Sequence, residues 1–133
     1  MKRNIILIVD DDPGVRKISE LWIKTYFPDN EVLLASGVDE AIEILQNQPI
    51  HVVISDWAMP EPDDGFVLAG KLEEYGFDMD QFLLTSGELS AGELPEGIDI
   101  QFVPKGDLDG LKAWCDDHIE PYQNVRHKNS DMR

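Results

Sequence analysis

The sequence contains a single cysteine, Cys115, so no disulfide can form within the chain. This is typical of a reducing compartment, and we expect the protein to be cytoplasmic. The sequence also lacks any run approaching the roughly 18 apolar residues that are needed to cross a membrane. The basic start of the chain is followed too soon by the acidic residues 10–12 to form a signal peptide. We therefore expect no membrane insertion.

Basic residues are scarce, because 11 Lys and Arg residues stand against 27 Asp and Glu residues and give a formal net charge of −16. Residues 25–104 hold seventeen acids and one base, Lys71, whereas the two ends of the chain balance. Such a surface repels phosphate backbones, so we expect no direct binding of nucleic acid. It favours cations and basic partner surfaces, although acidity that serves only solubility is an equal alternative.

The length of 133 residues is enough for one domain that buries roughly two-thirds of its unfolded surface. We predict this domain over residues 1–120. The remaining residues, 121–133, are polar and show no periodicity, so we expect them to form a mobile tail. A fragment of a longer protein with an output domain stays an alternative.

Five short apolar runs are predicted to be β-strands. Residues 4–9 and 50–55 are apolar almost throughout, which is typical of strands that are buried on both faces of a parallel sheet. The other three predicted strands are residues 31–35, 81–85 and 98–103.

Apolar residues at intervals of three or four predict helices between these strands. The first helix runs from Pro13, with Asp12 as its N-cap, to about Phe27, and the second runs from a Ser36 cap to before Pro49. The third follows Gly65 and passes through Leu68, Leu72 and Tyr75. The last runs from about Asp107 to Ile119. Their inner faces would include Val15, Ile18, Trp22, Tyr26, Leu108, Leu111 and Cys115. Residues 86–97 hold three glycines and a proline, so we expect at most a short or irregular helix there, over residues 90–94.

Strand–helix alternation of this kind predicts an α/β fold with a doubly wound parallel sheet, in which all strands end at the same edge. Polar residues follow four of the five strands at that edge: Asp10 and Asp11, Asp56, Thr85, and Lys105. Each has an ordinary explanation when taken alone, since an acid can start a loop and a lysine is usually solvated. Their convergence at the edge where open α/β sheets bind ligands indicates a functional site.

The residues at these strand ends also form a recognisable set of motifs. They are Ile8-Val9-Asp10-Asp11-Asp12, then Ser55-Asp56-Trp57-Ala58-Met59-Pro60 with Asp64-Gly65, then Leu84-Thr85-Ser86-Gly87, then Phe102-Val103-Pro104-Lys105. In this order and spacing the sequence resembles the receiver domain of bacterial response regulators, the CheY-like family, from residue 4 to about residue 119. The resemblance implies a flavodoxin-like, five-stranded sheet with strand order 2-1-3-4-5, and two-component signalling in which a sensor histidine kinase phosphorylates an aspartate.

The resemblance implies that Asp56 is the phosphoacceptor. It also implies that Asp10, Asp11 and Asp56, with the backbone carbonyl of Ala58, hold Mg²⁺. The residue types agree with this chemistry, because a carboxylate can act as a nucleophile toward phosphorus. Carboxylates gathered at one edge repel each other, and a divalent cation with oxygen ligands removes that penalty.

The resemblance gives Lys105 and Thr85 the task of contacting oxygens of the phosphoryl group. Phe102 would be the aromatic switch that turns inward when Thr85 moves, although a plain core residue is an equal alternative for it. Ala58 and Gly87 flank the acceptor, where the lifetime of the phosphoryl group is often tuned. Both are small, and whether they hinder or admit a hydrolytic water stays open.

We therefore predict a receiver that is phosphorylated reversibly on Asp56 with Mg²⁺ and that switches its binding to a downstream protein. It would not be an enzyme beyond its own phosphotransfer and autodephosphorylation. Two alternatives stay open. The protein could pass the phosphoryl group to a histidine phosphotransfer protein, or it could be an interaction module that is not phosphorylated.

Overall fold

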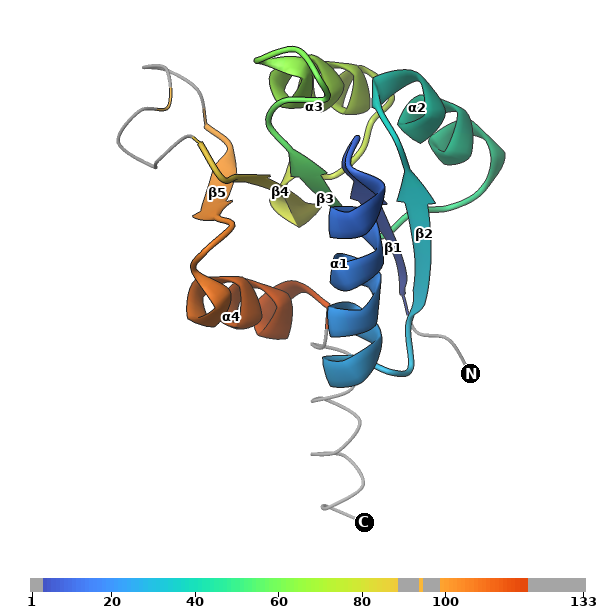
Figure 1. Ribbon diagram of the computed structural model, residues 1–133. Coiled ribbons are helices and arrows are strands. Elements are labelled where there is room, and N and C mark those ends of the chain that lie inside the picture. The colour runs from blue at the N-terminus through green and yellow to red at the C-terminus, as the bar shows by residue number, and fades with distance from the viewer. Residues whose placement is uncertain (1–3, 89–93, 95–98, 120–133) are drawn as a thin grey trace.

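The computed structural model describes residues 4–88, 94 and 99–119 (Figure 1). It contains a five-stranded, all-parallel sheet with the strand order β2-β1-β3-β4-β5. The strands are β1 (Ile5–Val9), β2 (Glu31–Ala35), β3 (Val52–Asp56), β4 (Phe82–Ser86) and β5 (Gln101–Pro104). The flavodoxin-like sheet and its order are therefore confirmed.

Within the described residues, four α-helices cover the two faces of the sheet. They are α1 (Pro13–Tyr26), α2 (Val38–Asn47), α3 (Asp64–Glu74) and α4 (Leu108–His118), and a short 3₁₀ helix, η1 (Met79–Gln81), precedes β4. Figure 1 shows α1 and α4 on one face and α2 and α3 on the other. Among the helices of the described residues, none has the length and hydrophobicity that would carry it across a bilayer.

Alternate residues of each strand serve the two helical layers. Ile6 and Ile8 of β1 pack in a buried cluster with Ile23 of α1 and Cys115 of α4. The intervening residues of β1 pack in a second cluster with residues of α2 and α3, such as Leu68. Burial on both faces is the reason that β1 is apolar at every position and that β3 and β4 begin with three apolar residues.

Side-chain caps fix the starts of α1 and α4, and at α4 the Oδ1 of Asp107 accepts a hydrogen bond from the N–H of Gly110 at 2.9 Å. Asp12 caps α1 as predicted, because its Oδ1 accepts hydrogen bonds from the backbone N–H groups of Gly14 and Val15 at 2.8 and 3.3 Å. The predicted Ser36 cap of α2 is wrong, since Gly37 precedes that helix and no side chain caps it. Instead the backbone N–H of Ser36 donates to Oε1 of Glu40 at 2.6 Å. A side chain of the first turn of α2 thus accepts a hydrogen bond from the backbone that precedes the helix.

Four residues that we predicted on inner helix faces lie outside. Ile18 is 69% exposed, Leu108 is 58% exposed, and Tyr26 and Tyr75 are also exposed. Trp22 packs against the core as predicted, but the most buried residue of α1 is Ile23, and Phe27 continues the inner face beyond the end of the helix. Tyr75 lies at the end of α3, where its hydroxyl accepts a hydrogen bond from Gln46 at 2.9 Å.

Two predicted segments fall outside the described residues. They are the short or irregular helix over residues 90–94, of which only Leu94 is described, and the polar tail over residues 121–133. The boundary of the predicted domain at residue 120 therefore stays a prediction.

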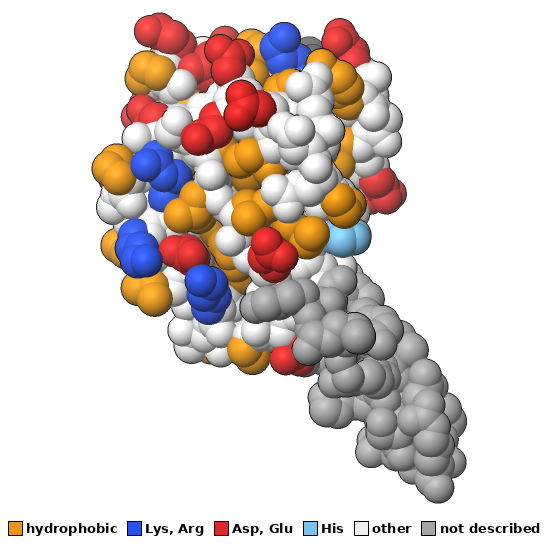
Figure 2. All heavy atoms as spheres, turned by 90° about the vertical axis from the view of Figure 1, so that its right-hand side faces the viewer, with side chains coloured by type: hydrophobic (Ala, Val, Ile, Leu, Met, Phe, Trp, Pro, Cys, Tyr) orange, Lys and Arg blue, Asp and Glu red, His pale blue; other side chains and the backbone are white. Residues whose placement is uncertain are grey.

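The uneven charge of the sequence is visible on the molecular surface. On the face drawn in Figure 2, Asp and Glu side chains gather toward the upper part, and the Lys and Arg side chains lie mainly on the left. In the sequence, three basic residues, Arg16, Lys17 and Lys24, belong to α1 and precede the strongly acidic stretch.

Gly65 joins the start of α3 to the end of β3. Its N–H donates to the carbonyl of Trp57 at 2.8 Å. A Cβ at this position would lie 2.6 Å from the carbonyl oxygen of Asp56 and 2.5 Å from Cδ1 of Leu84. Because the first of these atoms belongs to the backbone, it cannot turn away, and only glycine allows the helix to approach the strand end so closely.

We expect Gly65→Ala to lower the free energy of unfolding by about 1–3 kcal/mol, because the added methyl group forces α3 away from β3. Gly70→Ala in the same helix is the matched control, since a Cβ there meets nothing within 4 Å. It should raise stability by about 0.5–1 kcal/mol through helix propensity alone. Urea unfolding measures both changes, and equal stability of the two variants would contradict the close approach.

Candidate functional site

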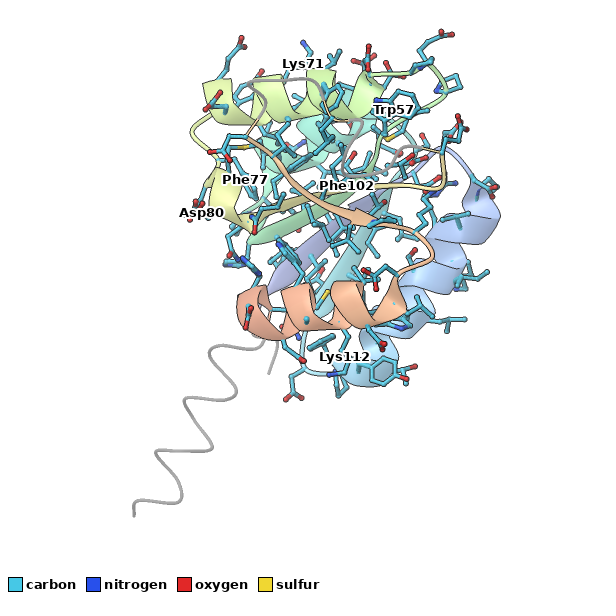
Figure 3. The ribbon with its side chains drawn as sticks, turned by 90° about the vertical axis from the view of Figure 1, so that its left-hand side faces the viewer. Trp57, Lys71, Phe77, Asp80, Phe102 and Lys112 are labelled. Atoms are coloured by element: carbon cyan, nitrogen blue, oxygen red, sulfur yellow. The ribbon has the colours of Figure 1, made fainter. Side chains whose placement is uncertain are left out.

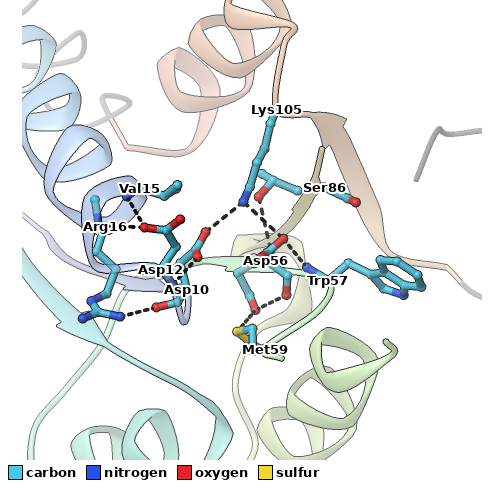
Figure 4. Close-up of polar contacts among 12 residues, drawn as sticks. Asp10, Asp12, Val15, Arg16, Asp56, Trp57, Met59, Ser86 and Lys105 are labelled. Carbon is cyan, nitrogen blue, oxygen red and sulfur yellow. Dashed lines mark hydrogen bonds and ion pairs between the residues drawn. The ribbon is translucent and has the colours of Figure 1, made fainter. Parts of the chain in front are cut away.

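Three strand ends bring two carboxylates and one ammonium group together (Figure 4). Asp10 follows β1, Asp56 ends β3, and Lys105 follows β5. The Nζ atom of Lys105 lies 2.9 Å from Oδ2 of Asp10 and 3.4 Å from Oδ1 of Asp56. The convergence predicted for these three residues is therefore present.

Asp10 is held at every polar atom. Its backbone N–H donates to the carbonyl of Ala35 at 3.1 Å, and its carbonyl accepts from Nη1 of Arg16 at 2.6 Å. Its Oδ1 accepts from the backbone N–H of Asp12 at 2.9 Å, and Oδ2 faces Lys105. The side chain is almost fully buried, so this carboxylate has a fixed position and little water to stabilise its charge.

Asp11 completes a group that could bind a metal ion. One carboxylate oxygen from each of Asp10, Asp11 and Asp56 lies within 4.8 Å of the others. Asp11 itself is exposed, so the group opens to solvent. An all-oxygen, carboxylate-rich donor set of this kind fits Mg²⁺, which uses few protein ligands and retains several waters.

A hollow of about 260 Å³ lies over these carboxylates. Its lining includes Ala58, which we predicted as a metal ligand through its carbonyl, and Gly87. Ser86 and Glu88 line it as well. The hollow provides room for an ion with its waters and for a substituent on Asp56.

The charges in the site influence one another. Burial raises the pKa of Asp56 above its ordinary value, and the negative charge of Asp10 raises it further. Lys105 and the N–H of Trp57 oppose this rise without cancelling it. The carboxylate of Asp56 is therefore costly to ionise in the absence of an additional cation.

Lys105 stays protonated. Burial acts to lower the pKa of its ammonium group, but the hydrogen bond to Asp10 and the charges of Asp10 and Asp56 outweigh that effect and raise the pKa. Its backbone N–H donates to the carbonyl of Ser86 at 3.0 Å, which fixes the start of the side chain beside β4. The lysine thus provides a permanent positive charge at the edge of the hollow.

Trp57 orients the carboxylate of Asp56 through its backbone. The N–H of Trp57 lies 2.8 Å from Oδ1 of Asp56 and 2.9 Å from the carbonyl of Thr85, so it bridges the ends of β3 and β4. The indole Nε1 donates to Oδ1 of Asp63 at 3.0 Å, which ties the loop after β3 to the start of α3.

Thr85 lies in register with Asp56 on the neighbouring strand. The residue is buried, and its hydroxyl lies 3.5 Å from the carbonyl of Ser55, which is long for a hydrogen bond. A hydroxyl held this weakly can turn toward a new acceptor beside Asp56.

Phe102 lies apart from the carboxylates. It is in register with Leu84, whereas Thr85 is in register with Val103. Phe102 packs, partly buried, against the cluster formed by α2 and α3, and Figure 3 shows it on β5. Its predicted role as an aromatic switch stays a prediction, because this position is also that of an ordinary core residue.

Sequence reasoning missed several contributors. Arg16 is the first base after the acidic triplet, and this spacing is a signal that could have been noticed. The role of the backbone N–H of Trp57 could not be predicted from the sequence, because every residue other than proline has such a group. Ser86 and Glu88 follow β4 at the same edge as Thr85, so their positions could have been inferred from the sheet.

The family model described as the response regulator receiver domain matches residues 6–99 of this chain. Response regulator Rre1 of Synechocystis sp. is 39% identical over 69 residues, which are 52% of this chain and 29% of Rre1. The chain spans half or less of the length of the curated relatives that it matches.

Solved structures give the same result for the fold. A response regulator receiver protein from Pseudomonas putida has a TM-score of 0.70 and 25% identity, and the match covers 88% of this chain and 98% of that one. The response regulator TrrA of Thermotoga maritima, solved in complex with Mg²⁺ and BeF, has a TM-score of 0.68 and 24% identity over 84% of this chain and 95% of that one.

We expect Lys105→Met to bind Mg²⁺ more tightly, by about tenfold at low ionic strength, because a positive charge beside the carboxylates is removed. Calorimetric titration measures the affinity. Lys71→Met is the matched control, since Lys71 lies on α3 (Figure 3) and does not line the hollow over the carboxylates, so its loss should change the affinity little. Weaker Mg²⁺ binding by Lys105→Met would show that the lysine does not compete with the cation.

Proposed function

The chain belongs to the family of response regulator receiver domains, and from this membership we propose that it is a phosphoacceptor of two-component signalling. In this proposal Asp56 accepts a phosphoryl group from a phosphohistidine of a sensor histidine kinase. The observation that carries the proposal is the convergence of Asp10, Asp11 and Asp56 beside Lys105.

The proposal includes Mg²⁺ held by these three carboxylates, with the carbonyl of Ala58 as a further ligand. The raised pKa of Asp56 supports it, since the ionised form of this carboxylate calls for a positive charge nearby. When bound, Mg²⁺ would supply that charge and neutralise an oxygen of the incoming phosphoryl group. The similar protein TrrA was solved with Mg²⁺ and BeF, which supports the same assignment here.

Asp56 acts as the nucleophile. The contacts of its carboxylate given above both go to Oδ1, so we assign the attack to Oδ2. A bond forms between Oδ2 and phosphorus as the bond between phosphorus and the imidazole nitrogen breaks, and the imidazole leaves with the electron pair. Asp56 becomes an acyl phosphate, and no oxidant or further reactant is needed.

Lys105 and Thr85 position the transferred group. The ammonium of Lys105 exchanges Oδ2 of Asp10 for a phosphoryl oxygen, a charge-assisted contact of the kind that lysine makes with phosphate. Thr85 turns from the carbonyl of Ser55 and donates to another phosphoryl oxygen. Both movements are small, because each side chain already lies beside Asp56.

The outcome is a change in binding to a downstream protein. The chain acts only on itself, by accepting the phosphoryl group and later losing it to water, and it is not an enzyme toward other substrates. The acidic stretch over residues 25–104 supports partners that are proteins with basic surfaces rather than nucleic acids. We place this signalling in the cytoplasm.

Incubation with acetyl phosphate, with and without Mg²⁺, tests the proposal by intact mass. We expect the wild-type protein to gain the mass of one phosphoryl group only when Mg²⁺ is present, and Asp56→Asn to gain none. The reason is that Asp56 lies in register with Thr85 and beside Lys105. Asp10 also lies beside Lys105, but both of its carboxylate oxygens already accept hydrogen bonds.

Asp63→Asn is the control for this experiment, because Asp63 is a nearby exposed carboxylate that contacts only the indole of Trp57 among the site residues described above. It should be phosphorylated like the wild type. The proposal is wrong if the wild type gains no mass, or if Asp56→Asn gains the same mass as the wild type.

A further inference from the structure

A cavity of about 190 Å³ lies between α1 and α4, against the ends of the central strands. Its walls are mainly apolar and come from β1, β3, β5 and the two helices, as in Ile8, Ile54, Val103, Trp22 and Leu111. It adjoins the hollow over the carboxylates, since Asp10, Val15, Asp56 and Lys105 line both.

Two exposed apolar residues lie at the mouth of this cavity, and their position there accounts for their exposure. Ile18 of α1 and Leu108 of α4 both line the cavity, and both are more than half exposed. Exposure of large apolar side chains costs free energy unless something covers them. Here they flank the entrance to an apolar interior, on facing helices.

The charged groups in the wall lie at the ends of the strands and are paired, whereas Ser19 lies on α1. Lys105 bonds to Asp10, and its Nζ also lies within ion-pair distance of Asp56. A water needs two to four polar partners, and away from the strand ends Ser19 is the polar side chain that the wall offers within the described residues. The volume also exceeds that of engineered apolar cavities of about 150 Å³, which bind benzene.

We propose that this cavity is a binding site for a small, neutral, apolar molecule about the size of one aromatic ring. The size follows from the volume, and the apolar character follows from the walls. Anions are excluded, because Asp10 and Asp56 lie in the wall and the chain carries a net charge of −16. Nothing in this step depends on phosphorylation.

The cavity and the acidic site share Lys105. Lys105 lines the cavity while its ammonium contacts Asp10, so a bound molecule packs against the lysine in this position. This second step rests on the proposed function, in which Mg²⁺ binds among these carboxylates. A cation beside Asp10 would repel the ammonium of Lys105 and draw it away from Oδ2 of Asp10. The bound molecule and Mg²⁺ then oppose each other, and by linkage each weakens the other equally.

Calorimetric titration with toluene, in buffer that contains a chelator and no phosphodonor, tests the site alone. We expect a dissociation constant of about 1 mM or tighter and no binding of benzoate. Methyl resonances of Ile8, Ile54 and Leu111 should shift, whereas those of Leu68 and Leu72 in the other core cluster should not. Binding of benzoate as tight as that of toluene would overturn the ligand class, and no binding of toluene would overturn the site.

Ser19→Phe fills the cavity from α1, because Ser19 lines it. We expect this variant to bind toluene at least about tenfold more weakly, a change typical of a lost apolar contact surface. Leu21→Phe is the matched control, since Leu21 is exposed on the same helix outside the cavity lining, and it should bind like the wild type. Val15→Phe replaces Ser19→Phe if that variant does not fold. A folded Ser19→Phe that binds like the wild type would overturn the assignment.

Repeating the toluene titration with saturating Mg²⁺ tests the link to Lys105. We expect toluene to bind at least about threefold more weakly than in the chelator. Unchanged toluene affinity, when Mg²⁺ binding is itself observed, would overturn the link while leaving the cavity site in place.

Discussion

Repulsion between carboxylates is the constraint on which the site depends. Asp10, Asp11 and Asp56 bring oxygens within 4.8 Å of one another at the end of an apolar sheet, where water can stabilise them only in part. Lys105 offsets part of this charge, and the raised pKa of Asp56 shows that the offset is incomplete. A site with this excess of negative charge favours the binding of a cation. Its electrostatic energy also changes strongly with any change of charge at Asp56.

The fold supplies the positions that hold this charge in place. Parallel strands end at the same edge, so three separate strand ends meet without any long loop. Local contacts then remove the remaining freedom. Arg16 and the amide of Asp12 fix Asp10, the amide of Trp57 fixes Asp56, and Gly65 allows α3 to close against the same strand. Stability and chemistry therefore depend on the same few residues.

Much of this arrangement could be predicted from the sequence, because it follows from periodicity. The apolar runs predict the central strands, and their alternation with helices predicts the parallel sheet. The carboxylates at the strand ends predict the position of the site. Other features depend on packing, which a sequence pattern does not contain. Ile18 and Leu108 match a helical stripe but lie at the mouth of a cavity, and Ser36 suits a cap but pairs through its backbone with Glu40. The role of Phe102 concerns a second conformation, which a single structure does not test.

The central claim is that a divalent cation binds among Asp10, Asp11 and Asp56 rather than across the acidic surface as a whole. Titration with Mn²⁺, which accepts similar oxygen ligands, measures this directly through the broadening of amide resonances. The account predicts broadening first at Asp11, Asp56 and Trp57, reversed by excess Mg²⁺ and absent at equal Mn²⁺ in Asp11→Asn. Broadening that begins over α2 and α3, or that is the same in Asp11→Asn, would contradict it.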